Sequence, residues 1–480
     1  PLCLVGSEMC IRDRYFDPLN LESVSEILLR EKAHGILLQF GGQTAINLAL
    51  PLSENLHQLE KMGLNLSIEG TTPESVDEAS DRKRFEDFAK RCNLRMPRGT
   101  TAIDPEGVRE AVSVIGYPVL IRPSYVLGGR GMEILSNDDQ LEAYMREAYL
   151  SPERPLLIDE YLGNAIELDV DAVCDGKEVL IGAIMEHLEE AGIHSGDSTC
   201  FIPPQNIPEK ILDLVEQWTT VIGLELGIMG CYNIQFAIRG EELYVLEVNP
   251  RGSRTFPFVA KATGVPLARI AARVALGEKL SSLDIPKPQS EAVSVKAPVF
   301  PFIKLRGLDP APGPEMKSTG EVMGSHARPA AAYLKARMAT ELPVPTTGGV
   351  YLTVKDEDKH DTIPLAKRLQ EMGFKIFATP GTASELRKGS IDVETCYRIA
   401  ERKSPDALDL MRRGMIQLVI NTPTASGGAV LDGNMMRRLA VELNIPFVTT
   451  MAGARMEVEA IAEMQLGTPE PRLLEISTLE

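Results

Sequence analysis

The spacing of hydrophobic positions changes several times along the 480 residues, and each change marks an expected element. Apolar residues recur at helical spacing over residues 21–32, 81–93, 138–149 and 361–372, which predicts amphipathic helices there. Thr72 followed by Pro73 is typical of a helix start, and the segment at 379–382 (TPGT) predicts a turn. Short apolar or alternating runs predict strands at 35–40, 116–122, 156–162, 167–173, 179–185, 349–354, 375–378, 417–421 and 446–449.

These patterns group into regions, so the expected fold class is a multidomain chain of α/β and α+β architecture. Residues 15–71 are predicted to form a truncated α/β layer, and residues 72–276 a two-lobed α+β domain. Residues 277–341 are predicted to be a proline-rich extension and linker. Residues 342–480 alternate strands and helices, which predicts a doubly wound βαβ domain.

The most informative segment is a predicted hairpin. Its first strand is residues 232–238, its turn is residues 239–242, and a second apolar run follows. Because side chains alternate faces along a strand, Glu247 and Asn249 point the same way, and Gln235 joins them if it lies opposite Glu247. Carboxylate and amide oxygens suit Mg²⁺, which takes its other ligands from phosphates and water. The hairpin therefore indicates a magnesium–nucleotide site, although the short motif is also typical of a solvated edge strand.

A glycine-rich loop follows the strand that ends near Arg122. Its Gly128-Gly129-Arg130-Gly131 can bring backbone N–H groups close to phosphates, because glycine has no Cβ, although a plain turn has the same sequence. Arg82, Arg122 and Arg130 could neutralise phosphate charge through paired hydrogen bonds, although isolated arginines are usually surface residues.

Residues 185–198 are rich in histidine and acids, including His187 and His194. A transition-metal site is one interpretation, but the spacing is irregular and favours a polar loop over a nucleotide. Trp218 lies among apolar residues at helical spacing and is expected in the core. No Ser/His/Asp or Cys/His nucleophile arrangement stands out.

Net charge, cysteine spacing and the length of apolar runs argue against several classes of function. The net charge of −18 argues against nonspecific binding to nucleic acid or anionic membranes. The seven cysteines form no C-x-x-C pair, which favours reduced thiols and a cytoplasmic location. The sequence contains no uncharged apolar run of 18 residues, so no membrane-spanning helix is predicted. Residues 1–14 lack an initiator methionine and resemble translated sequencing-adapter sequence, so we expect the native chain to begin near Tyr15, within a truncated domain.

Taken together, these stretches resemble the ATP-grasp domain and tail of the carbamoyl-phosphate synthetase large subunit family. The matching text is QFGGQT (39–44), GYPVLIRPSYVLGGRGM (116–132), IMEHLEEAGIHSGDS (184–198), NIQFAI (233–238), EVNPRGSRTFPFVAKATGVPLA (247–268) and GPEMKSTGEVMG (313–324). The resemblance covers nearly everything after Arg14 and follows the order of the family's C-terminal half. It implies a truncated pre-ATP-grasp domain at 15–71, an ATP-grasp domain at 72–276 with its extension, and a regulatory domain similar to methylglyoxal synthase at 342–480.

The resemblance also implies roles for individual residues. Gln235, Glu247 and Asn249 would hold Mg²⁺ or Mn²⁺, and Gln235 and Glu247 would also border the nucleotide, while Arg251 and Arg254 would sit beside the γ-phosphate and its acceptor. The other ATP-binding positions would be Arg82, Arg122, Gly128, Gly129, Glu160, Leu162, Glu167, Gly192, Ile193, His194 and Ser195. Leu162 would bond adenine through its backbone and Glu167 the ribose, whereas Glu160 stands where the family often has a basic residue.

In the C-terminal half of this family's large subunit, carbamate attacks the γ-phosphate of ATP. The products are ADP and carbamoyl phosphate, and carbamoyl phosphate feeds arginine and pyrimidine synthesis. The implied partners are a glutaminase small subunit and the other half of the large subunit. Lys359, Thr379, Thr382 and Asn421 match an effector pocket for uridine monophosphate. Glu189 and Asp197 match acidic residues of an ornithine site. Ala297 stands where that site commonly has glutamate, which predicts weak ornithine binding.

Two other functions fit parts of the sequence. Another ATP-grasp ligase, similar to biotin carboxylase, would share the hairpin but not the tail beyond Leu342. A non-catalytic nucleotide-binding module would share the tail, but the complete set of Gln235, Glu247 and Asn249 disfavours it.

Overall fold

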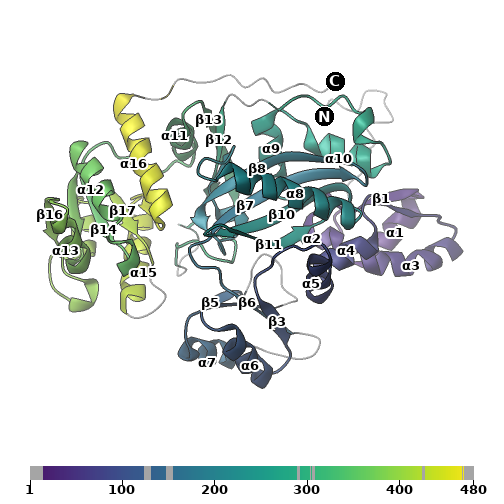
Figure 1. Ribbon diagram of the computed structural model, residues 1–480, viewed down its shortest axis with the longest axis horizontal. Coiled ribbons are helices and arrows are strands. Elements are labelled where there is room, and N and C mark those ends of the chain that lie inside the picture. Colours follow the sequence, from purple (N-terminus) through teal and green to yellow (C-terminus); the bar gives the residue numbers. More distant parts are fainter. Residues whose placement is uncertain are drawn as a thin grey trace.

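The computed structural model describes residues 15–123, 131–147, 155–288, 292–302, 304, 309–423, 428–467 and 469. An N-terminal helical layer and a C-terminal domain lie at opposite ends of a large central sheet, and a small lobe projects from one side of it (Figure 1). No helix within these ranges is long and apolar enough to cross a membrane.

The N-terminal layer is built around two short parallel strands. Asn20 caps the first helix by accepting a hydrogen bond from the Ser23 N–H, as expected for an asparagine N-cap. The elements are α1 (Leu21–Glu31), β1 (Gly35–Leu37), α2 (Gly42–Ile46), α3 (Ala49–Lys61) and β2 (Ser67–Glu69). Thr72 is the N-cap and Pro73 the first residue of α4 (Pro73–Ser80), as predicted, and α5 (Arg82–Arg91) follows.

The small lobe is an antiparallel sheet in the order β3-β6-β4-β5, and helices α6 and α7 cover one face of it (Figure 1). Its elements are β3 (Gly99–Ala102), α6 (Pro105–Ile115), β4 (Val119–Pro123), β5 (Glu133–Leu135), α7 (Asp138–Glu147) and β6 (Leu156–Glu160).

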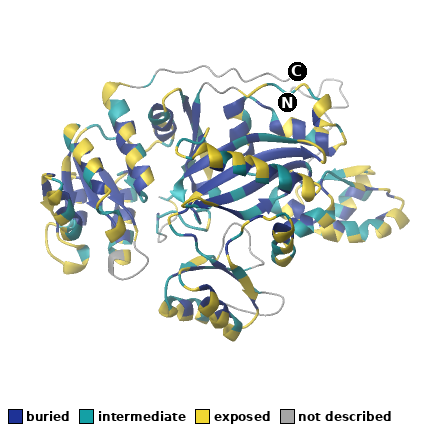
Figure 2. Cartoon of the chain, viewed as in Figure 1, coloured by how far each residue is buried: buried dark blue, intermediate teal, exposed yellow. Residues whose placement is uncertain are grey.

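The central sheet has the strand order β11-β10-β7-β8-β9-β12-β13. Its middle strands are buried on both faces, because α8 packs on one face and α9 and α10 on the other (Figures 1 and 2). Trp218 on α8 packs against this core, as predicted. The elements are β7 (Ile166–Asp175), β8 (Val179–Glu190), β9 (Cys200–Ile202), α8 (Glu209–Glu225), β10 (Met229–Arg239), β11 (Glu242–Asn249), α9 (Phe256–Thr263) and α10 (Leu267–Ala275).

The proline-rich region completes this sheet rather than only linking two domains. It supplies β12 (Val293–Val299), which pairs with β9, and β13 (Gly320–His326), which forms the far edge. Helix α11 (Pro329–Ala339) then packs on β12 and β13. The sequence did not predict this helix, because its small apolar residues show little periodicity.

The C-terminal domain is a parallel sheet in the order β16-β15-β14-β17-β18, with helices on both faces, as predicted. One prediction fails: Thr379–Thr382 is not a simple turn but the start of α13, with Thr379 at the N-cap and Pro380 in the first helical turn, a position that favours proline. The elements are β14 (Gly349–Thr353), α12 (Thr362–Glu371), β15 (Lys375–Ala378), α13 (Pro380–Lys388), β16 (Val393–Thr395), α14 (Ala407–Arg412), β17 (Leu418–Asn421), α15 (Gly428–Glu442), β18 (Phe447–Val448) and α16 (Met451–Leu466).

Candidate functional site

The predicted hairpin is formed by β10 and β11, and Gln235 lies directly opposite Glu247. A register shift follows this pair, because Phe236 then pairs with Val245 and leaves Leu246 as the extra residue of a β-bulge. The Asn249 amide donates a 2.8 Å hydrogen bond to the Glu247 carboxylate. Gln235, Glu247 and Asn249 therefore gather on one half-buried face at the end of the hairpin, as predicted.

The N-terminal layer holds the arginine that follows this hairpin. Arg251 donates to the Asn249 side-chain oxygen at 2.9 Å and to the Gln43 side-chain oxygen at 2.8 Å. Burial lowers the pKa of the Arg251 guanidinium. Gln39, also from the N-terminal layer, donates to the backbone carbonyls of Cys231 and Pro250 at 3.2 Å. These contacts fix the layer against the end of the hairpin.

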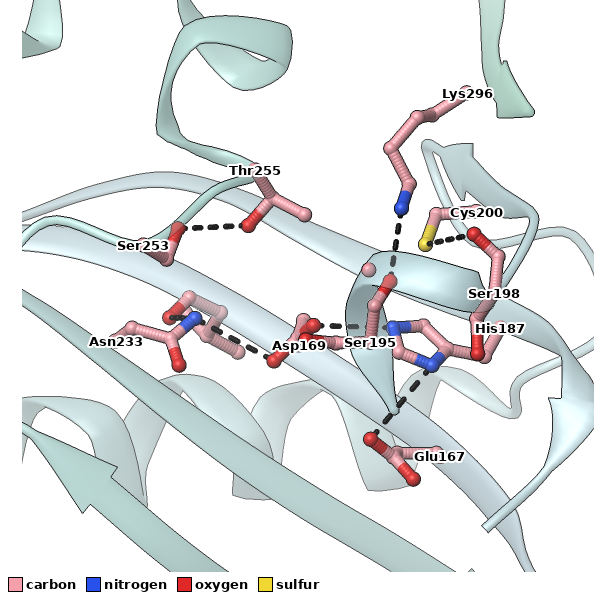
Figure 3. Close-up of polar contacts among 12 residues, drawn as sticks. Glu167, Asp169, His187, Ser195, Ser198, Cys200, Asn233, Ser253, Thr255 and Lys296 are labelled. Atoms are coloured by element: carbon pink, nitrogen blue, oxygen red, sulfur yellow. Dashed lines mark hydrogen bonds and ion pairs between the residues drawn. The ribbon is translucent and has the colours of Figure 1, made fainter. Parts of the chain in front are cut away.

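Buried carboxylates on β7, the strand next to β10 in the same sheet, form the floor of the site beside the hairpin. Asp169 lies opposite Gln235 in the ladder, so the alternate residues Glu167, Asp169 and Asp171 share one face. The Asn233 amide donates to Asp171 at 2.9 Å, and the hydroxyls of Ser253 and Thr255 donate to it at 2.7 and 2.8 Å. Figure 3 shows the Asn233 amide directed at Asp169, 3.4 Å away, and the Ser253 and Thr255 hydroxyls bonded to each other.

His187 on β8 lies between two of these carboxylates. Its Nε2 is 3.1 Å from Asp169 and its Nδ1 is 3.7 Å from Glu167 (Figure 3). Burial opposes the charged imidazole, but the neighbouring Cys200, Asp169 and Glu167 raise the pKa of His187 overall. Burial also raises the pKa of Glu167 to about 7 and that of Asp171 to about 6. The floor is therefore a buried polar cluster in which burial favours the protonated forms of Glu167 and Asp171.

This cluster predicts a pH dependence of stability. The pKa of Glu167 rises on folding from 4.5 to about 7, so the folded protein holds a proton that the unfolded chain releases over this window. The contribution of Glu167 to the unfolding free energy must then fall as pH rises through the window. Replacing Glu167 by Gln removes that fall.

We expect the variant's unfolding free energy, minus that of the wild type, to rise with pH by about 1.4 kcal/mol for each unit of the pKa shift. Urea denaturation of both proteins at several pH values between about 5 and about 7 measures the difference, which cancels the opposite slopes of other carboxylates. A difference that stays level with pH would contradict the raised pKa of Glu167.

A loop between β8 and β9 covers this floor. The Gly192 N–H donates to Glu167 at 3.2 Å, and the Gly196 N–H donates to the His194 Nδ1 at 3.0 Å. The fully buried Lys296 ammonium donates to the Ser195 carbonyl at 2.8 Å (Figure 3). Gly192 thus contacts Glu167 directly, and Ile193, His194 and Ser195 follow it in the same loop.

Two of the arginines predicted to bind phosphate, Arg82 and Arg122, both contact Asp159 on β6 of the small lobe. Arg82 donates to Asp159 at 2.6 Å, and Arg122 lies 3.5 Å from the other oxygen of the same carboxylate. Among the described residues, the buried Nε of Arg122 has no hydrogen-bond partner. An anionic ligand would satisfy that donor.

Other predicted positions have different surroundings. Glu160 binds Arg98 at 3.0 Å and Arg239 at 2.9 Å, while Leu162 is buried in the connection between the lobes. Arg254 donates to the sulfur of Met316. Gly128, Gly129 and Arg130 lie outside the described residues.

The residues assigned to effectors fall in two places. In the C-terminal domain, a Cβ on Gly381 would lie 2.8 Å from the Lys359 ammonium, so Lys359 stands at the start of α13 beside Thr379 and Thr382. Asn421 ends β17, its amide donating to the Thr353 carbonyl at 3.1 Å.

The acidic pair lies instead by the loop over the floor. Glu189 accepts from the Thr199 N–H at 2.6 Å, and the fully buried Asp197 accepts from the Lys317 and Ser318 N–H groups at 2.8 and 2.9 Å. Ala297 is buried on β12.

Several buried ionisable residues around the site were not predicted from the sequence. Asp159, Asp169, Asp171 and Lys296 are all buried and charged, and the structure places them around the predicted positions. The alternation of acids at residues 167, 169 and 171 within an apolar strand was a usable signal, because buried carboxylates are rare unless paired. Within the described residues, no group of three or more His, Cys, Asp or Glu side chains could hold a metal ion, so the transition-metal interpretation of the 185–198 segment gains no support.

Models of three protein domain families match three stretches of the chain. Residues 4–78 match the "Carbamoyl phosphate synthase preATP-grasp domain", residues 81–283 the "Carbamoyl-phosphate synthase L chain, ATP binding domain", and residues 361–449 the "MGS-like domain". A Methanocaldococcus jannaschii protein, "Carbamoyl phosphate synthase large chain, C-terminal section", is 46% identical over 94% of this chain and 74% of its own length. The chain belongs to the carbamoyl phosphate synthase large chain family.

Several relatives in this family are longer than this chain. The Methanothermobacter thermautotrophicus large chain is 47% identical over 96% of this chain but only 43% of its own length. This chain therefore spans less than half of that full-length relative.

Solved structures share the fold at lower identity. The biotin carboxylase domain of Hydrogenobacter thermophilus 2-oxoglutarate carboxylase, determined with MgADP and bicarbonate, matches 68% of this chain and 79% of its own with a TM-score of 0.53 and 20% identity. N5-carboxyaminoimidazole ribonucleotide synthetase from Thermus thermophilus covers 68% of this chain and 85% of its own at a TM-score of 0.50 and 17% identity. At such identities the likeness establishes the fold alone.

Proposed function

We propose that this chain phosphorylates carbamate with ATP to give carbamoyl phosphate and ADP, as the C-terminal half of a carbamoyl phosphate synthase large chain. The observation that carries the proposal is the hairpin end, where Gln235 faces Glu247 and where Asn249 links Glu247 to Arg251. It supplies oxygen ligands and an arginine within one connected group. Phosphoryl transfer mainly requires such positioning and charge stabilisation.

The donor set fits a hard divalent cation. Gln235, Glu247 and Asn249 would hold Mg²⁺ or Mn²⁺, which would neutralise phosphate charge during transfer. The single carboxylate in this set leaves coordination positions for water and phosphate oxygens. The amide nitrogen of Asn249 now faces Glu247, so its side-chain oxygen would have to turn to join the set.

The remaining residues bind and enclose the reactants. Arg82 and Arg122 would leave their shared Asp159 to contact phosphates, which would give the unpaired Nε of Arg122 a partner. Glu167 would accept from the ribose hydroxyls, and the loop Gly192–Ser195 would exclude water. Exclusion of water matters because carbamate decomposes in it. Arg251 would lie at the γ-phosphate, with Arg254 on the acceptor side.

The proposal extends to the parts of the enzyme that lie beyond this chain. Overall synthesis would need a bicarbonate-phosphorylating half and a glutaminase subunit as partners. In the C-terminal domain, the Lys359 ammonium would exchange its partner Asp356 for the phosphate of uridine monophosphate, which the N-terminal N–H groups of α13 would also bind. Ornithine would bind weakly near Glu189, because Asp197 is already occupied by backbone donors and Ala297 provides no carboxylate.

The decisive experiment is the reverse reaction, which needs only this half. Purified protein mixed with MgADP and carbamoyl phosphate is expected to form ATP, measured by luciferase luminescence. Omission of the divalent cation, with a chelator present, should abolish the signal. A folded sample that binds MgADP by calorimetry but forms no ATP would contradict the proposed function.

A further inference from the structure

One segment connects the C-terminal domain to the loop over the carboxylate floor. Residues Asp309–Ser318 lie between β12 and β13 and contact the C-terminal domain at their first residue and the loop Gly192–Ser198 at their last residues. We refer to this stretch as the connecting segment.

Arg437 on α15 binds the first residue of the connecting segment. Its side chain is 3% exposed and forms a fork on Asp309: Nε donates to one carboxylate oxygen at 2.8 Å, and Nη2 donates to the other. Its third nitrogen, Nη1, donates to the Asn421 side-chain oxygen. Such a two-pronged contact fixes orientation as well as distance, which a lysine cannot reproduce.

The far end of the connecting segment holds the loop that covers the floor. Asp197 accepts from the N–H groups of Lys317 and Ser318, and the His194 N–H donates to the Gly313 carbonyl at 3.0 Å. Met316 meanwhile contacts Arg254. The position of this segment therefore sets the position of groups that belong to the proposed nucleotide and acceptor site.

The two ends are also tied to each other. The Lys317 ammonium donates to the carbonyls of Asp309 and Ala311 at 3.2 and 2.6 Å. A displacement of Asp309 would therefore disturb Lys317, whose own N–H holds Asp197. The path from Arg437 to the loop runs through hydrogen bonds between described atoms at every step.

We propose that Arg437 is a positioning residue for the nucleotide site, which it reaches through Asp309 and the connecting segment. This inference rests on the proposed function, because it takes the loop Gly192–Ser195 to line the nucleotide. Loss of the fork should loosen the loop and weaken MgADP binding. Coupling between distant sites commonly changes affinity by about 5- to 150-fold, and we expect about tenfold here.

The test compares Arg437→Lys and Asp309→Asn with the wild type and with Arg455→Gln. Arg455 forms an exposed ion pair with Asp361 inside the C-terminal domain and is the matched control. Calorimetry gives the Kd for MgADP, reverse-reaction kinetics separate KM from kcat, and melting curves report folding. The two conservative variants keep the side-chain size, so they remain informative if Arg437→Ala does not fold.

We expect both variants to raise the Kd and KM for MgADP about tenfold, with little change in the control. The double variant should be no worse than either single one, because both remove the same contact. Lower melting temperatures with unchanged MgADP affinity would make the fork merely structural and overturn the inference alone. A wild-type chain that binds no MgADP would overturn the proposed function as well.

Discussion

Replacing Glu247 by Gln should reduce ATP formation from MgADP and carbamoyl phosphate by at least about 100-fold, since even outer partners of metal ligands cost 10- to 100-fold when lost. The reason is that Glu247 is the only carboxylate in the proposed ligand set, beside the amides of Gln235 and Asn249. Glutamine keeps the size of the side chain and a hydrogen-bond acceptor for Asn249. The fold should therefore persist, which a melting curve checks.

Glu242→Gln is the matched control for this change. Glu242 begins the same strand but lies at the other end of the hairpin, where it pairs with Arg95 at the surface. The Glu242→Gln variant should form ATP from MgADP and carbamoyl phosphate as fast as the wild type does. The metal assignment fails if Glu247→Gln keeps near-normal activity when Mg²⁺ is limiting.

Replacing Glu457 by Ala should lower the free energy of unfolding by about 3–5 kcal/mol, the usual cost of removing one partner of a buried ion pair. Glu457 on α16 is fully buried and binds Arg337 on α11 at 3.0 Å. The Tyr333 hydroxyl donates to the same carboxylate at 2.8 Å. Without the Glu457 carboxylate, the buried Arg337 guanidinium and the buried Tyr333 hydroxyl lose their acceptor. Both lie where the C-terminal domain packs on α11 of the central domain.

Urea denaturation measures this change, with Glu459→Ala as the control. Glu459 lies on the same helix but is exposed, so its loss should cost little. The double variant Arg337→Met with Glu457→Leu should recover most of the stability, because apolar side chains of similar size replace both charges. A loss below about 1 kcal/mol in Glu457→Ala would contradict the role given to this pair, since ordinary surface substitutions already change stability by up to about 0.5 kcal/mol.

The parts of the site that the sequence predicted correctly were those with a local signal. Alternation and a turn sufficed to predict the hairpin, and its register fulfils the condition that Gln235 lies opposite Glu247. The Asp309–Arg437 fork has no such signal, because its residues are far apart in the chain and each alone resembles a surface charge. The helix at Pro329–Ala339 was missed because alanines on every face hide the period by which a helix is recognised.

The error at Thr379 has a similar cause. Threonine followed by proline and glycine is typical both of turns and of helix starts, and only the buried positions of α13 decide between them. Thr72 was interpreted correctly because Pro73 is followed by a charged first turn rather than a glycine.

The order of strands in the central sheet also bears on how the chain folds as it leaves the ribosome. β9 ends at Ile202, whereas its second neighbour, β12, begins only at Val293, so one edge of β9 stays unpaired until β12 has been synthesised. Pairing across such a separation is slow, and an unpaired strand edge can recruit another chain. The interval between the synthesis of β9 and that of β12 is therefore a stage at which an exposed strand edge favours aggregation.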